Sequence, residues 1–251
     1  MTFGHALAVL AAALAAGAIN AVVGSGTLIT FPTLLALGYP AVLANVSNNV
    51  GLVPGSAAAT WAYRRELAGQ RHRLIRLMPA STVGALVGAT LLLVLSSGAF
   101  KAVVPVLIGT ACVLVLLQPR LTAALARRPA GTDSRSFGLL LPATVGLTGV
   151  YGGYFGAAQG VLLIGLLATL SGEPSMQRNN AVKNVLATTA NLAAAVLFIC
   201  SHPVDWAVAG LIAGGSTVGG LLGGRYGRRL PPSALRALIV LIGVVAIVRM
   251  L

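Results

Sequence analysis

The stretch Gly24-Ser-Gly-Thr-Leu-Ile-Thr-Phe-Pro-Thr-Leu-Leu-Ala-Leu-Gly-Tyr-Pro40 decides the fold, because the chain contains a second version of it. The second version reads Gln159-Gly-Val-Leu-Leu-Ile-Gly-Leu-Leu-Ala-Thr-Leu-Ser-Gly-Glu-Pro174. Each version has a Gly-rich break, an apolar stub of 12 residues and a Gly-x-Pro ending, and the two are offset by 134 positions. The sequence therefore predicts an internal duplication.

Both versions lead into a membrane-length segment whose polar residues share one helical face. Their spacing follows the i, i+3, i+4 rule, and the two sets match at an offset of 135 positions. The first set is Asn45, Asn48, Asn49 and Ser56, and the second is Asn180, Lys183, Asn184 and Asn191. Duplication around broken hydrophobic segments is typical of secondary transporters.

Composition places the chain in a membrane. Hydrophobic residues make up 57% of its 251 residues and charged residues 8%, and the mean hydropathy is +0.92. We expect an all-α polytopic membrane protein with two inverted repeats. The formal charge of +13 comes from arginine clusters between apolar runs, which indicates membrane topology rather than nucleic-acid binding. Cys112 and Cys200 lie in apolar runs, and we expect no metal site and no cofactor.

Ten apolar segments are expected, five in each half of the chain. Two of them, 27–37 and 160–170, cover only about 17 Å as helix, so we expect half-helices or re-entrant elements. The full set is 3–23, 27–37, 41–62, 74–96, 101–118, 138–158, 160–170, 176–200, 205–222 and 235–250. These segments predict a first repeat at 1–118, an Arg-rich cytoplasmic linker at 119–137 and a second repeat at 138–251.

The arginine clusters predict the orientation. They lie at 64–76, 120–135 and 225–236, and all three belong on the cytoplasmic side. Segment 41–62 then ends in the cytoplasm, whereas its repeat partner 176–200 ends outside. The two copies therefore point in opposite directions, with both termini outside.

The breaks and the polar stripes predict the substrate site. Irregular backbone survives at membrane depth only where protein or water supplies hydrogen bonds, so we expect the two breaks to meet near the midplane. Helix starts at Thr27 and Val161 would present N–H groups to an anion. Close helix packing is the alternative for the glycines spaced by four at 149/153 and 152/156/160, and we expect it for the set at 215/219/223. The candidate residues are Gly24, Ser25, Gly26, Thr27, Asn45, Asn48, Asn49, Gln159, Gly160, Asn180, Lys183 and Asn184.

Lys183 is an ionisable residue inside a span, which makes it a candidate for function. The four acidic residues of the chain lie at segment ends or in loops, so an anionic substrate is its expected counter-ion. The alternative is that its side chain snorkels to the cytoplasmic interface. For Ser56 and Asn191, hydrogen bonds between helices compete equally with a substrate role.

The chain resembles the sulfite exporter TauE/SafE family of bacterial membrane permeases in the order of its motifs. These are a Gly-rich turn, an apolar stub that ends in Leu-Ala-Leu-Gly-Tyr-Pro40, the stretch Ala44-Asn-Val-Ser-Asn-Asn49 and a degenerate second copy. The resemblance covers essentially the whole chain. It implies export of a small sulfur-containing anion, such as sulfite, a sulfonate or thiosulfate, across the inner membrane. An anion channel is the alternative, and we expect no enzymatic activity because no catalytic constellation is visible. The expected partners are this anion and the lipid bilayer.

Overall fold

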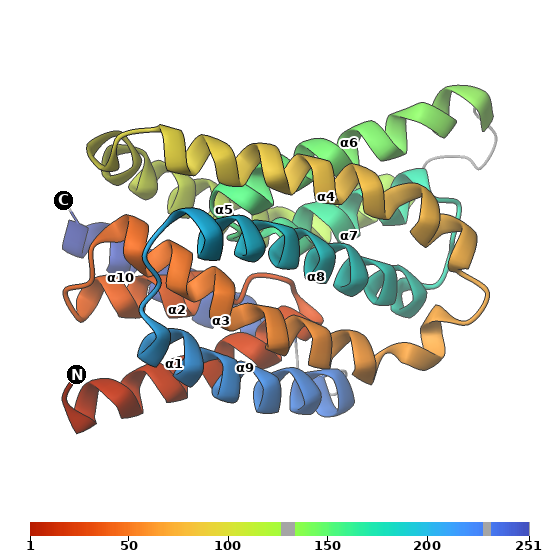
Figure 1. Ribbon diagram of the computed structural model, residues 1–251. Helices are drawn as coiled ribbons and strands as arrows, with labels where there is room; N and C mark the ends of the chain where they lie inside the picture. Colours follow the sequence, from red (N-terminus) through yellow and green to blue (C-terminus); the bar gives the residue numbers. More distant parts are fainter. Residues whose placement is uncertain (127–133, 228–231, 251) are drawn as a thin grey trace.

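The computed structural model describes residues 1–126, 134–227 and 232–250. These residues form ten α-helices and the 3-10 helix η1, Arg64–Leu67, in a bundle of roughly antiparallel helices (Figure 1). The helices are α1 Phe3–Val22, α2 Thr27–Ala36, α3 Ala41–Ala62, α4 Arg71–Val94, α5 Ser97–Ala126, α6 Ser134–Tyr154, α7 Gln159–Leu170, α8 Met176–Ser201, α9 Trp206–Tyr226 and α10 Pro232–Met250. The all-α fold class is confirmed.

Five helices are long and apolar enough to cross a membrane: Phe3–Val22, Arg71–Val94, Ser97–Arg120, Met176–Ser201 and Trp206–Tyr226. Large apolar side chains such as Leu7, Val83 and Val106 are exposed on their outer faces. A soluble protein would bury such side chains, whereas a bilayer solvates them. The protein is therefore a multi-pass membrane protein.

The helix boundaries follow the expected segments closely, with one difference at the centre of the chain. α5 was expected to end near residue 118, yet it continues to Ala126, and α6 begins at Ser134 rather than at 138. Leucine, alanine and arginine are strong helix formers, so α5 continues beyond the end of the apolar segment 101–118. The rest of the predicted linker, with Arg127, Arg128 and Asp133, lies outside the described residues, as do Arg228 and Arg229.

α2 and α7 are the two short helices that the sequence predicts. They have 10 and 12 residues, or about 15 and 18 Å, which is half of a hydrocarbon core. The helices before them end alike. Gly24 and Gly156 adopt φ angles of +86° and +78°, and each donates its N–H to the carbonyl five residues earlier. Left-handed backbone of this kind favours glycine, which explains the Gly-rich breaks.

The helix contacts of one half recur in the other. α9 packs against α1 and α3, and α4 packs correspondingly against α6 and α8. The Ser216 hydroxyl donates to the Gly51 carbonyl at 3.1 Å, and the Ser81 hydroxyl donates to the Leu186 carbonyl at 3.1 Å. The two serines are 135 positions apart in the sequence, and so are the two acceptors. Residues at equivalent positions of the two repeats thus form equivalent hydrogen bonds. This recurrence agrees with the predicted duplication.

The matched helices α3 and α8 lie side by side and antiparallel (Figure 1). Asn191 donates to the Ser56 hydroxyl at 3.4 Å, and the Thr60 and Thr188 hydroxyls are 3.0 Å apart. The contact partners on α8 therefore run from Asn191 back to Thr188 as those on α3 run from Ser56 to Thr60, as expected for antiparallel helices. Met1 and the end of α10 lie at the same end of the bundle (Figure 1), as expected. Which end faces the cytoplasm stays a prediction.

Cysteine labelling tests that orientation. In a variant with both native cysteines replaced, Arg71→Cys should react with a membrane-impermeant maleimide only from the cytoplasm, and Gly98→Cys only from outside. Arg71 is exposed and Gly98 has open space around its Cα, so both sites are accessible at opposite ends of the bundle. Labelling of both positions from the same side would contradict the topology.

Candidate functional site

The two Gly-rich breaks meet inside the bundle. The Gly160 N–H donates to the Gly24 carbonyl at 3.0 Å, and a Cβ atom on either glycine would overlap the Cα of the other. Ser25 and Gln159, their neighbours, are buried. The structure therefore brings the breaks together, as the sequence predicts. We call residues 20–27 and 151–160 the junction.

The second polar stripe binds the end of α1. The Lys183 ammonium donates to the carbonyls of Asn20 and Ala21 at 3.0 and 3.4 Å. Asn180 and Asn184 donate to the same Ala21 carbonyl at 3.1 and 3.4 Å. The last carbonyls of a helix lack partners within the helix and carry partial negative charge. Residues of one half thus complete a helix of the other half.

Lys183 is fully buried, with 0% of its surface exposed. Its ammonium lies against the end of α1 rather than at the surface, so the snorkelling alternative is wrong. Its two acceptors are neutral carbonyls, and no carboxylate among the described residues pairs with it. An ammonium has three donors, and two are used. No described side chain therefore supplies a negative charge beside the Lys183 amine.

The first polar stripe makes the reciprocal contact. Asn45, which matches Asn180 in the repeat, donates to the carbonyl of Tyr154, the last residue of α6, at 3.1 Å. Asn48, which matches Lys183, donates instead to the Thr27 hydroxyl at 3.5 Å and accepts a short hydrogen bond from Thr30. Both stripes thus contact the end of a helix in the other half, but their hydrogen bonds differ in detail, and only the second contains an ionisable side chain.

Several buried polar atoms at and beside the junction have no hydrogen-bond partner among the described residues. They include the Ser25 hydroxyl, the Gln159 amide nitrogen and the Asn49 and Asn180 amide oxygens, all on predicted site residues. The Tyr151 hydroxyl joins them. Buried polar atoms normally find partners, so these unpaired groups are candidates to bind water or a ligand. Both donors and acceptors are available there.

The structure corrects some of the predicted glycine and N–H roles. The Val161 N–H donates to the Ala158 carbonyl at 3.0 Å, because Ala158 turns the chain with a φ of 59°, and is therefore not open to an anion. A Cβ on Gly26 would lie 2.6 Å from the Ala16 carbonyl, so this glycine also serves packing. Gly149 and Gly153 face the backbone of α4, and the set at 215, 219 and 223 faces α1, as the packing alternative predicts.

Sequence reasoning missed three contributors to the junction. The Asn20 carbonyl accepts a hydrogen bond from Lys183, and the Asn20 side chain donates to the Ser56 hydroxyl at 3.1 Å. A polar residue inside the apolar segment 3–23 is the sequence feature that could have identified Asn20. Ala21 acts through its backbone alone, which no sequence pattern reveals. Tyr151 has no counterpart in the repeat. Ser56 and Asn191 bond between helices, which agrees with the interhelical alternative.

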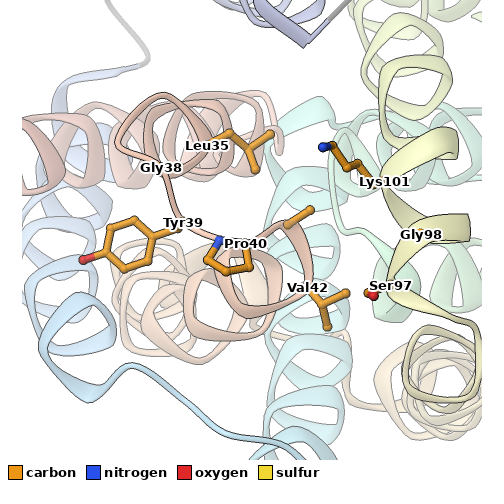
Figure 2. Close-up of a pocket in the computed structure, with 9 residues that line it drawn as sticks. Leu35, Gly38, Tyr39, Pro40, Val42, Ser97, Gly98 and Lys101 are labelled. Atoms are coloured by element: carbon orange, nitrogen blue, oxygen red, sulfur yellow. The ribbon is translucent and has the colours of Figure 1, made fainter.

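An aromatic layer lies beside the junction. Phe31 packs edge-on against Phe155 at 5.1 Å and against Phe100 at 6.4 Å, measured between ring centroids. Phe31 lies one helical turn after Thr27 of the junction and one turn before Leu35. Leu35 lines a pocket of about 580 Å³ that also contains Ser97 and Lys101 (Figure 2). Phe31 thus lies on the same face of α2 as Thr27 of the junction and Leu35 of this pocket, and it packs against Phe155 of the junction.

A glycine pair on α7 tests the close approach of the breaks. Gly160→Ala should abolish transport and lower the Tm by several degrees, because overpacking costs about 1–3 kcal/mol. Gly165→Ala is the matched control, since nothing lies within 4 Å of its Cβ position. It should be neutral or slightly stabilising. Equal behaviour of the two variants in transport and thermal unfolding would refute the tight junction.

Comparison with known proteins agrees with this architecture. The family model "Sulfite exporter TauE/SafE" matches residues 9–250. The chain is 29% identical to the probable membrane transporter protein YfcA of Escherichia coli (strain K12), covering 95% of this chain and 87% of that protein. It is 27% identical to a probable membrane transporter protein, ORF9, of Sinorhizobium sp, with coverage of 98% and 93%. No solved structure gives a significant match. The chain therefore belongs to the sulfite exporter TauE/SafE family of membrane transporters.

Proposed function

We propose that this protein is a secondary transporter that exports a small sulfur-containing oxyanion, such as sulfite, a sulfonate or thiosulfate, across the bacterial inner membrane. The observation that carries the proposal is the buried Lys183 ammonium, whose protein acceptors are neutral carbonyls at the junction. A charge removed from water costs several kcal/mol unless it is compensated. A bound anion would supply the compensation, and no enzymatic step is part of the proposal.

The available donors suit an oxyanion. The third N–H of Lys183, the Ser25 hydroxyl and the Gln159 amide nitrogen can donate to oxygen atoms of sulfite or a sulfonate. Charge-assisted hydrogen bonds of this kind are stronger than neutral ones. The flanking amides of Asn45, Asn48 and Asn184 would hold the helices in register around the anion.

The surroundings favour a carrier over an open channel. Ser25, Thr27 and Gln159 of the junction are buried, and Phe31, Phe100 and Phe155 pack against one another beside them. In this proposal these rings move before an anion leaves through the Lys101 pocket. A monoanion leaving a negative-inside cell gains about 2.3 kcal/mol per 100 mV, so the membrane potential alone can drive export. Saturable flux with counterflow would distinguish a carrier from the alternative, an anion channel.

Substitution of Lys183 tests the site. Lys183→Met keeps most of the side-chain volume but removes the charge, and charge-assisted bonds contribute about 1.5–3 kcal/mol. Sulfite affinity of the purified protein should therefore fall roughly 10- to 150-fold. Lys183→Arg should also weaken binding, because a planar guanidinium does not fit a site for a compact ammonium.

Two controls separate binding from folding. Lys101→Met removes an exposed lysine and should leave sulfite affinity within about twofold. Thermal unfolding of Lys183→Met without ligand reports the loss of the α1 contacts. If that variant loses stability but binds sulfite with unchanged affinity, Lys183 only braces the helix end and does not bind the anion.

A further inference from the structure

A second basic site lies at one end of the bundle, away from the junction. It is a pocket of about 620 Å³ where the end of α3, η1 and the end of α9 come together. No junction residue lines it. Its lining includes Trp61, Arg64, Arg65, Glu66, Leu221 and Arg225. Three arginines and one glutamate give this lining a formal charge of +2.

Local contacts orient the arginines. The Arg64 guanidinium lies 4.6 Å from the centre of the Trp61 ring and donates to the Trp61 carbonyl at 3.1 Å. The Arg225 guanidinium lies 5.6 Å from the centre of the Tyr226 ring. Stacking on an aromatic face leaves much of a guanidinium free to bind an oxyanion, and its fork matches a phosphate.

The pocket also has an apolar side. Trp61 is 62% exposed and Leu221 42% exposed, and Leu222 and Tyr226 beside them are exposed as well. Tryptophan and tyrosine gather at the level of lipid headgroups, and basic pockets between helices on the cytoplasmic side bind anionic headgroups. A water-soluble anion would gain nothing from the exposed apolar residues, whereas a phospholipid would cover them with its acyl chains.

We propose that this pocket binds the phosphate headgroup of an anionic phospholipid of the cytoplasmic leaflet. Arg64 and Arg225 contact the phosphate from α3 and α9, and Trp61 and Leu221 contact the acyl chains. Because α3 and α9 pack closely in this fold, the bound lipid stabilises their cytoplasmic ends against each other.

Lipid titration of the purified full-length protein in detergent tests this site. Phosphatidylglycerol should raise the Tm, and phosphatidylcholine, which has no net charge, should raise it much less. Each arginine near a membrane surface contributes about fivefold to binding of anionic lipid. The double variant Arg64→Gln/Arg225→Gln should therefore bind phosphatidylglycerol about 25-fold more weakly.

Arg71→Gln is the matched control, because it removes an exposed arginine at the same end of the bundle but outside the pocket. It should keep wild-type lipid affinity, and native mass spectrometry should show phosphatidylglycerol retained by it and lost by the double variant. Equal loss in Arg71→Gln would overturn the proposal in favour of diffuse surface charge. Stabilisation by inorganic phosphate equal to that by phosphatidylglycerol would also overturn it, in favour of a free-anion site.

Discussion

The structure depends on one interaction, the contact between a buried ammonium and the end of a broken helix. Lys183 and its two asparagine neighbours on α8 supply hydrogen bonds to carbonyls of α1 that the helix itself leaves unpaired. Without such partners a helix could not end inside the bundle, since unpaired carbonyls in an apolar medium are costly. The break that follows, its contact with the second break and the short helix α2 all require this ending.

The reciprocity of the two halves explains why duplication suits this architecture. α8 completes α1, and Asn45 on α3 completes α6 through the Tyr154 carbonyl. Each half therefore supplies the polar partners that the other half needs. The copies differ at one important position, where Asn48 of the first matches Lys183 of the second. This lysine, in an otherwise neutral pair of stripes, is the basis of the proposed anion site beside the junction.

Much of this fold could be predicted from the sequence, because the repeat, the apolar segment lengths and the helical spacing of the polar residues all leave direct patterns. The meeting of the breaks also followed from the need to pair irregular backbone. The partners of the stripes could not be predicted, since every residue has a carbonyl and Ala21 carries no distinguishing side chain. Similarly, the sequence left two roles open for Gly149 and Gly153, a place at the substrate site and helix packing, and they pack on α4. The glycine spacing alone does not distinguish these roles.

The most direct test of the anion site at the junction is a structure of the protein with selenite, a heavier analogue of sulfite whose selenium scatters anomalously. We expect an anomalous peak within hydrogen-bond distance of the Lys183 amine, beside the contact of Gly24 with Gly160. A peak confined to the Lys101 pocket, or no peak at saturating selenite while the protein still transports it, would contradict an anion site at the junction.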